Sequence, residues 1–243
     1  MKQPFNLTKG SRSHSMSRKI GFYLTALFTL MTPLGLAEEG MDWGNTTGNV
    51  ALTSNYVFRG ISQTQSRPTL QGSLDYSHPA GFYLGFWGSG LDYGVSQPRH
   101  EFDFYGGYTH SINKSLSLSV GALNYAFVGQ GTRNTLEFPL KLQWEDFRIG
   151  YAFAPLWLGT GGFGGYASAG WTRPYAWHLS PAVSLGVSHF SGKAPYSAYA
   201  DFRAGISRPF LGITADVSLT AVTRHQFSEN DKNKLIFTLS KSL

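Results

Sequence analysis

Few residues of this 243-residue chain carry side chains suited to catalysis or metal binding. The six histidines after residue 37 lie mostly near predicted turns and lack a metal-ligand spacing such as H-x-x-x-H. The glycine-rich stretch Gly159 to Gly165 lacks the Gly-Lys-Ser/Thr ending and the following helix of a phosphate loop, so we expect a flexible outer loop there. The sequence therefore predicts no metal site and no cofactor. The histidines are His78, His100, His110, His178, His189 and His225.

Two Ser/His neighbours could serve nucleophilic catalysis, as in a lipid-modifying barrel enzyme. His110-Ser111 and Ser188-His189 would each need a nearby Glu and mutual hydrogen-bond reach. Adjacent residues on a strand point to opposite faces, however, so both are poor catalytic pairs. We predict no catalytic residue and no enzymatic activity, and the lipid-modifying enzyme remains the less favoured alternative.

Charged side chains on the polar side of predicted strands are the candidates for a pore lining. There are four basic and six acidic ones, and a wall with both signs gives weak ion selectivity at most. Such charges could also pair across the barrel, as Asp201 and Arg203 would, two residues apart on one face. The candidates are Arg59, Asp75, Glu101, Asp103, Glu137, Lys141, Arg148, Asp201, Arg203 and Asp216.

The elements that must position these residues are strands, because apolar and polar residues alternate with a period of two. This alternation predicts twelve strands, three of them between Gly48 and Asp92, and it is weakest in the eighth, around Tyr166 to Arg173. In the first strand the alternation places Phe58 toward lipid and Arg59 inward at the outer mouth. There Arg59 would either lock the first loop to the wall through a carboxylate or select the solute.

The connections between the predicted strands alternate between longer and shorter. Outer-membrane barrels have long outer loops and short periplasmic turns, and an even strand number places both termini in the periplasm. The longer connections are Gly60–Arg67, Tyr93–Arg99, Gly129–Asn134, Pro155–Gly164, Gly192–Pro195 and Arg224–Asn233. The shorter ones are His78–Gly81, Ile112–Lys114, Glu145–Asp146, Pro174–Ala176 and Arg208–Pro209.

The first 37 residues have the pattern of an export signal. Ser17 to Lys19 supply a positive region, Ile20 to Leu34 an apolar region and Gly35-Leu36-Ala37 a small-x-small site, so we expect cleavage after Ala37. The apolar run is too interrupted for a membrane anchor of about 20 residues. Residues 1–37 are thus a predicted signal peptide, with Met16 a better initiator than Met1, and residues 38–243 a single barrel domain.

Removing the leader changes the charge of the chain. Five of the 20 Lys and Arg lie before residue 38 and none of the 14 Asp and Glu do, which leaves 15 basic against 14 acidic residues. The basic character of the full sequence therefore gives no reason to expect a nucleic-acid partner. Cysteine is absent, so an exported chain must be held by a large core or a closed sheet.

Aromatic residues near strand ends favour a membrane barrel over a soluble β-sandwich or lipocalin-like barrel. Strand alternation alone does not tell inside from outside, but aromatic girdles mark the two membrane interfaces. The predicted fold is all-β, a single antiparallel transmembrane β-barrel of about 12 strands with short periplasmic turns and longer outer loops. The girdle candidates are Phe58, Tyr76, Phe82, Tyr93, Tyr108, Trp144, Phe147, Trp157, Trp177 and Phe210.

One stretch also resembles a known family. The run SNYVFRGIS at residues 54–62, followed by Pro68, Gln71-Gly72, Asp75-Tyr76 and Gly81-Phe82-Tyr83, resembles the N-terminal signature of the TorF-type porins of proteobacterial outer membranes. The resemblance is strongest over residues 48–92 and implies an outer-membrane barrel. One departure is the end of the chain, Lys241-Ser242-Leu243, where such barrels usually carry an aromatic residue.

We therefore predict an outer-membrane porin that lets small hydrophilic solutes or ions diffuse passively. Eight-stranded barrels are filled by side chains and barrels of 16–18 strands are open, so about twelve strands are compatible with an open or a plugged lumen. The alternative is a structural or recognition barrel that acts through its loops. The expected partners are outer-membrane lipid and lipopolysaccharide, the outer-membrane assembly machinery and small polar solutes.

Overall fold

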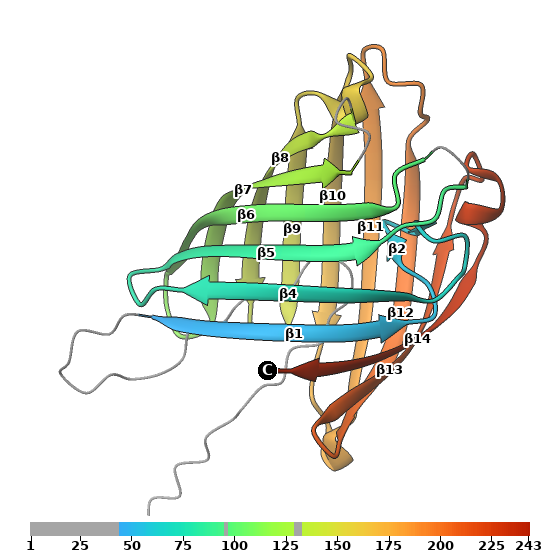
Figure 1. Ribbon diagram of the computed structural model, residues 1–243. Coiled ribbons are helices and arrows are strands. Elements are labelled where there is room, and N and C mark those ends of the chain that lie inside the picture. Colours follow the sequence, from blue (N-terminus) through green and yellow to red (C-terminus); the bar gives the residue numbers. More distant parts are fainter. Residues whose placement is uncertain (1–43, 95–96, 129–132) are drawn as a thin grey trace, which may run out of the picture.

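The computed structural model describes residues 44–94, 97–128 and 133–243. Twelve antiparallel strands close into one barrel, in which β14 returns to pair with β1 (Figure 1). This confirms the predicted fold class and strand number. The predicted signal peptide and the cleavage site after Ala37 lie outside the described residues.

The wall strands follow the chain in order around the barrel. They are β1 (Asn45–Thr53), β4 (Thr69–Ser77), β5 (Phe82–Gly90), β6 (His100–Ser111), β7 (Leu116–Phe127), β8 (Thr135–Trp144), β9 (Phe147–Ala154), β10 (Phe163–Thr172), β11 (Ser180–Ser191), β12 (Tyr199–Phe210), β13 (Ile213–Val222) and β14 (Lys234–Ser242). The closing seam between β1 and β14 has five paired positions, whereas β1 and β4 have nine.

The apolar side of each strand faces outward. Phe104, Leu140 and Val217 are exposed on the outer surface, whereas Asp103 and Glu137 are buried inside. A soluble barrel would bury the apolar side chains and expose the charged ones. The observed orientation is that of a barrel with hydrocarbon outside and polar groups within, which is why the strands alternate so regularly.

Connections of two to four residues gather at one end of the barrel, here called the turn end, together with one of seven residues between β10 and β11. The connections at the other end, the loop end, have seven residues or more. At the turn end β8 and β9 are joined by two residues, and Trp144 stacks on Phe147 with ring centroids 5.9 Å apart. Leu211 and Gly212 both have positive φ, 50° and 76°, as a type I′ hairpin requires. The turn predicted at Arg208–Pro209 is therefore wrong, because β12 continues to Phe210 before this pair reverses the chain.

Three predicted girdle residues belong to the interior. Phe58 and Tyr93 pack against a buried cluster of Tyr56, Trp87 and Leu91, and Trp157 is buried within η2 (Trp157–Gly159). All three lie in segments at the loop end that fold over the lumen. The prediction that Phe58 faces lipid is therefore wrong.

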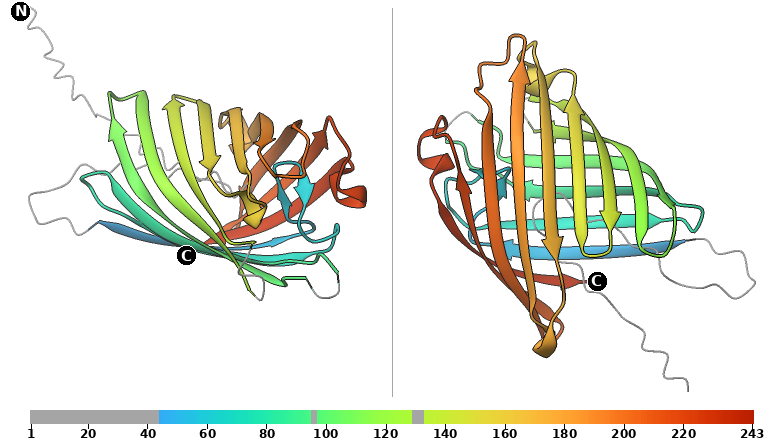
Figure 2. Two further views of the ribbon diagram at one scale, coloured as in Figure 1. Left: turned by 90° about the horizontal axis from the view of Figure 1, so that it is seen from above. Right: turned by 180° about the vertical axis from the view of Figure 1, so that it is seen from behind.

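The first loop is the main departure from the predicted strands. β1 ends at Thr53, and the chain then forms a small hairpin of β2 (Val57–Phe58) and β3 (Ile61–Ser62) that is separate from the wall. Figure 1 labels β2 inside the ring of strands, and Figure 2 shows the blue-green hairpin between opposite sides of the barrel near the loop end. We call residues 54–66 the inner hairpin.

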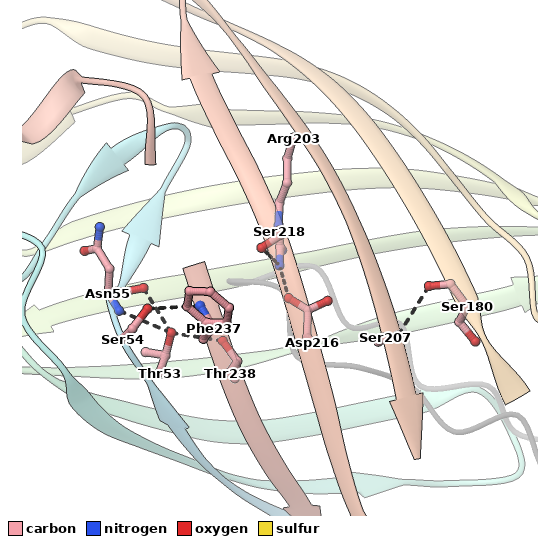
Figure 3. A network of polar contacts seen from close by, with 10 residues as sticks. All are labelled: Thr53, Ser54, Asn55, Ser180, Arg203, Ser207, Asp216, Ser218, Phe237 and Thr238. Carbon is pink, nitrogen blue, oxygen red and sulfur yellow. Dashed lines mark hydrogen bonds and ion pairs between the residues drawn. The ribbon is translucent and has the colours of Figure 1, made fainter. Parts of the chain in front are cut away.

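Ser54 is the point at which the chain leaves the wall. Its N–H donates to the carbonyl of Phe237 at 2.8 Å, while its Oγ, not its carbonyl, accepts the N–H of Phe237 at 3.0 Å (Figure 3). A side chain thus replaces the backbone acceptor in the ladder, and the carbonyl is released. The next residue, Asn55, is buried inside the barrel.

Within the described residues, helical structure is limited to single turns. Besides η2 the loops and turns contain η3 (Ala176–His178) and η4 (Ser228–Asp231). Over the described ranges, no helix has the length and apolar character needed to cross a bilayer.

Candidate functional site

The inner hairpin is held together by its own buried side chains. Asn55 Oδ1 accepts hydrogen bonds from Ser62 Oγ at 2.6 Å and Thr64 Oγ1 at 3.1 Å. The backbone N–H of Tyr56 donates to Thr64 Oγ1 at 3.1 Å, and that of Gln63 to the Tyr56 carbonyl at 2.7 Å. Buried polar groups that satisfy one another in this way favour one defined conformation over a mobile loop.

Aromatic contacts fix the base of the hairpin to the first strands of the barrel. The ring of Tyr56 lies 5.2 Å from that of Trp87 on β5, and Phe58 meets Tyr125 on β7 edge to face at 5.8 Å. At these centroid distances, aromatic rings attract each other in addition to the stabilisation that comes from burying their apolar surface. The segment is thus anchored to one side of the lumen.

The tip of the hairpin contacts β8, the wall strand next to β7, through Arg59. One Nη atom lies 2.7 Å and 2.8 Å from the two carboxylate oxygens of Glu137 on β8, and Tyr125 also donates to this carboxylate at 2.7 Å. The guanidinium carbon lies 4.3 Å from the centre of the Tyr166 ring. Burial lowers the pKa of Arg59, but the Glu137 carboxylate and nearby tyrosines more than offset this and raise it above its ordinary value.

Arg59 therefore lies on the inner hairpin and not on a wall strand, so the predicted continuation of the first wall strand to Arg59 is wrong. It sits in the two-residue turn of the inner hairpin, with φ of 47°. Its contact with Glu137 corresponds to the predicted lock between the first loop and the barrel wall. The two side chains are 6% and 2% exposed, so the ion pair is shielded from solvent.

Gly60 completes the turn and presses against a third region of wall. Its φ is 79°, and a Cβ atom here would lie 2.4 Å from Cγ1 of Val222 and 2.9 Å from Cβ of Asp201. Only glycine combines this backbone conformation with such close approach. The hairpin thus extends across the lumen from β5 to the β12–β13 wall.

A cavity of about 180 Å³ lies beside the hairpin within the barrel. Seven of the ten predicted pore-lining residues line it: Arg59, Glu137, Lys141, Arg148, Asp201, Arg203 and Asp216. Asp75, Glu101 and Asp103 lie outside this lining. Neutral residues such as Ser168, Gly170 and Ser184 supply much of the remaining surface.

Arg203 pairs with Asp216 and not with Asp201, its predicted partner. Its Nη donates to Asp216 Oδ1 at 3.0 Å and Ser218 Oγ at 2.8 Å, both on β13 (Figure 3). Asp201 instead accepts a hydrogen bond from Tyr166 at 3.2 Å. Cross-strand register therefore decides the pairing, and Asp201 is left beside the tip of the inner hairpin.

The three acidic residues outside the cavity lie on β4 and β6. Tyr105 donates a hydrogen bond to Asp75. Glu101 and Asp103 are buried, and Asp103 is paired in register with Trp87 and Tyr125, the two rings that anchor the hairpin. Within the described ranges no group of three or more His, Cys, Asp or Glu side chains could hold a metal ion.

The candidate Ser/His pairs do not form a catalytic constellation. Ser188 is buried, whereas His189 stacks on the partly exposed Tyr151 with ring centroids 5.9 Å apart. His110 and Ser111 are both exposed at the turn end of β6. Residues 159–165 contain the end of η2 and the start of β10 rather than a phosphate loop followed by a helix.

The sequence does contain a signal for the inner hairpin. Arg59-Gly60 lies between the short pairs Val57-Phe58 and Ile61-Ser62, and a two-residue turn ending in glycine is typical of a β-hairpin. The signal was masked because the period-two alternation of β1 continues unbroken through Phe58. A wall strand and a hairpin strand inside the barrel both show the same alternation of apolar and polar residues.

Comparison with known proteins supports the same architecture. The structure is similar to one described as "KdgM porin" (TM-score 0.50, 9% identity, covering 82% of this chain and 98% of that one). It is also similar to "NanC porin structure in rhombohedral crystal form" (TM-score 0.53, 9% identity, covering 81% and 98%). At these identities the likeness shows the fold alone. No curated protein matches the sequence significantly.

The sequence itself matches a family model over residues 38–243. The family is described as a bacterial protein of unknown function (Gcw_chp), so the match does not confirm the resemblance to the TorF-type porins. Because the match spans most of the sequence, the chain belongs to the Gcw_chp family of bacterial proteins.

Proposed function

We propose that the protein is an outer-membrane porin through which small hydrophilic solutes or ions diffuse passively, and that the inner hairpin narrows its loop end. The observation that carries this proposal is a closed barrel with an apolar outer surface around a cavity lined by charged and hydroxyl side chains. The shared fold with two porin structures supports it. So does the resemblance of residues 48–92 to the TorF-type porins.

The proposed location is the bacterial outer membrane, with the loop end outside and the turn end in the periplasm. The export pattern before residue 38 supports this location, and the family match that begins at residue 38 supports cleavage after Ala37. The apolar outer surface would contact outer-membrane lipid and lipopolysaccharide. Insertion would require the outer-membrane assembly machinery.

We assign the ten charged candidates to the lumen wall and assign no catalytic residue. Seven of them line the cavity, which supports a role in the solute pathway. Ser188 and His189 point to opposite faces of β11, which supports a non-enzymatic barrel.

Conductance of refolded protein in planar bilayers tests the proposal. We expect discrete current steps for the wild type and larger steps for a variant in which residues 57–62 are replaced by two glycines, because the inner hairpin no longer crosses the lumen. A matched control is deletion of residues 193–195 from the outer loop between β11 and β12, which should leave the step size unchanged. Circular dichroism and heat-modifiable migration on gels would verify that each variant is folded.

One observation favours the second candidate function, a structural or recognition barrel that acts through its loops. Tyr56, Ser62 and Thr64 of the inner hairpin are almost fully buried, so the hairpin fills part of the loop end. Under this function the wild type would be silent and only the hairpin variant would conduct. A folded wild type without current would overturn the porin proposal, and current from the hairpin variant alone would then assign the barrel to this second function.

A further inference from the structure

One side of the barrel wall contains acidic residues but no Lys or Arg. It consists of β1 and β4 to β7, which are neighbours in the barrel and whose charged residues are Asp75, Glu101 and Asp103. The Lys and Arg of the described wall strands all lie on β8, β9, β12 and β14. Glu101 and Asp103 are buried, whereas Asp75 is half-buried. On this side of the lumen, Asp75 is therefore the acidic side chain that a solute can reach.

The Asp75 carboxylate has one engaged oxygen. The hydroxyl of Tyr105 on β6 donates a hydrogen bond to Oδ1. No other residue that the structure describes donates to this carboxylate or forms an ion pair with it. The second oxygen, Oδ2, is therefore available to a solute.

The side chain of Tyr105 lies along the wall rather than pointing at the barrel axis. It starts on β6 and reaches Asp75 on β4, so it crosses the intervening strand β5 (Figure 1). The residue of β5 in register with both is Gly85. A Cβ atom at Gly85 would lie 2.5 Å from Cζ of Tyr105 and 2.7 Å from its hydroxyl oxygen. The ring therefore occupies the space that this glycine leaves open.

Tyr83 lies along the wall in the opposite direction. It starts on β5 and is in register with Gly107 on β6, which is in register with Gly121 on β7. Cβ atoms at Gly107 and Gly121 would lie 2.6 Å and 2.5 Å from the hydroxyl oxygen of Tyr83. Because the pairs Tyr83 with Gly107 and Gly85 with Tyr105 follow each other along the inner face, the two tyrosines lie side by side.

These two rings can be reached from the lumen. Both are half-buried, whereas Tyr56 and Trp87 are buried at the base of the inner hairpin. Neither Tyr83 nor Tyr105 stacks on another aromatic ring within the described residues. The face of an aromatic ring carries partial negative charge, so it attracts a cation placed over it.

We infer that Tyr83, Tyr105 and Asp75 form a subsite for a small organic cation that carries an alkylated ammonium group. Aromatic faces bind the methyl groups of such a cation, and one carboxylate balances its charge. A bare metal ion would need more oxygen ligands, and the described residues contain no group of three or more His, Cys, Asp or Glu that could hold one. This inference rests on the proposed porin function and adds a solute class to it.

Two measurements with choline chloride test the subsite. Isothermal titration calorimetry on refolded protein in detergent micelles detects binding without any current, and planar bilayers detect saturable inhibition of the potassium current. We expect both effects in the wild type. Asp75→Asn should weaken choline binding by about tenfold, and Tyr83→Leu by about fivefold. Tyr83→Phe keeps the ring face and should bind choline as the wild type does.

Two matched controls remove the same groups elsewhere. Glu145→Gln removes an acidic charge from the exposed turn between β8 and β9, and Tyr108→Leu removes a ring from the outer surface of β6. Both should bind choline with wild-type affinity, and glucose, a neutral polyhydroxy probe, should not compete.

The outcomes separate the two proposals. A conducting wild type that does not bind choline, or an Asp75→Asn variant with unchanged affinity, would overturn the subsite and leave the porin function standing. Binding of glucose in place of choline would also overturn the cation subsite. A folded wild type that binds choline but carries no current would overturn the porin function and support the subsite as a binding site.

Discussion

The guanidinium of Arg59 lies 2.7 Å from the carboxylate of Glu137, a residue 78 positions later in the chain. The contact joins the tip of the inner hairpin to β8, and both side chains are buried. A buried ion pair adds little net stability compared with apolar packing, but breaking one by removing a single partner is expensive. The pair therefore fixes where the hairpin lies in the lumen.

The first prediction concerns this ion pair. Arg59→Gln should lower the free energy of unfolding by about 3–5 kcal/mol, because it leaves Glu137 buried without its counter-charge. The double variant Arg59→Gln with Glu137→Gln should recover much of that loss. Urea unfolding in detergent micelles, followed by tryptophan fluorescence, would measure both. Additive effects of the two single changes would show that the residues are not coupled.

The second prediction concerns Gly60. Gly60→Ala should displace the inner hairpin, because the new methyl group would lie 2.4 Å from Val222 and the backbone has positive φ. Gly212→Ala is a matched control, since its φ is also positive, 76°, but nothing lies within 4 Å of the added atom. The control should cost about 1 kcal/mol from backbone strain, and Gly60→Ala clearly more. Equal losses in melting temperature would contradict the close contact with the wall.

The third prediction concerns the outer surface. An arginine at Leu140, which is exposed on the outside of β8, should cost about 2–4 kcal/mol of folding stability in a bilayer. The same change at Ser73, which lies on the lumen-facing side of β4, should cost much less. Free energies of unfolding measured in lipid vesicles would distinguish the two variants. A larger loss at Ser73 than at Leu140 would reverse the assignment of inside and outside.

The fourth prediction uses the absence of cysteine from the sequence. A cysteine at Ser168 lines the cavity and should react with a water-soluble maleimide, whereas a cysteine at Phe104 on the outer surface should be shielded by lipid. Labelling in vesicles and again after detergent extraction gives the comparison. Protection at 168 with rapid reaction at 104 in vesicles would contradict a solvated lumen.

The barrel itself was predictable because lipid and lumen impose opposite demands on neighbouring residues. Leu140 faces hydrocarbon and Lys141 faces the lumen, and the same contrast recurs on most of the wall strands. The local sequence therefore indicates, residue by residue, which side of the sheet faces lipid and which faces the lumen. Turn chemistry was less reliable, since Leu211-Gly212 rather than Arg208-Pro209 reverses the chain.

The interior contacts were not predictable from local sequence. The pairing of Arg203 with Asp216, rather than with Asp201, depends on the register between β12 and β13. The pairing of Arg59 with Glu137 depends on the chain leaving the wall at Ser54, where one hydroxyl replaces one carbonyl. Both pairings depend on contacts between residues far apart in the sequence. The alternation of apolar and polar residues would be the same if either arginine had another partner.

The closing seam has the fewest paired positions of the barrel's strand pairs among the described residues, five between β1 and β14. The pairing continues one step beyond β14, since the backbone N–H of Leu243 donates to the carbonyl of Gly48 at 2.9 Å. The seam also joins strands that lie farthest apart along the chain, so closing it costs the most loop entropy. We therefore expect the pairing of β14 with Asn49–Thr53 to be the last step of barrel assembly, and the amide protons of this seam to exchange with solvent before those of the other strand pairs.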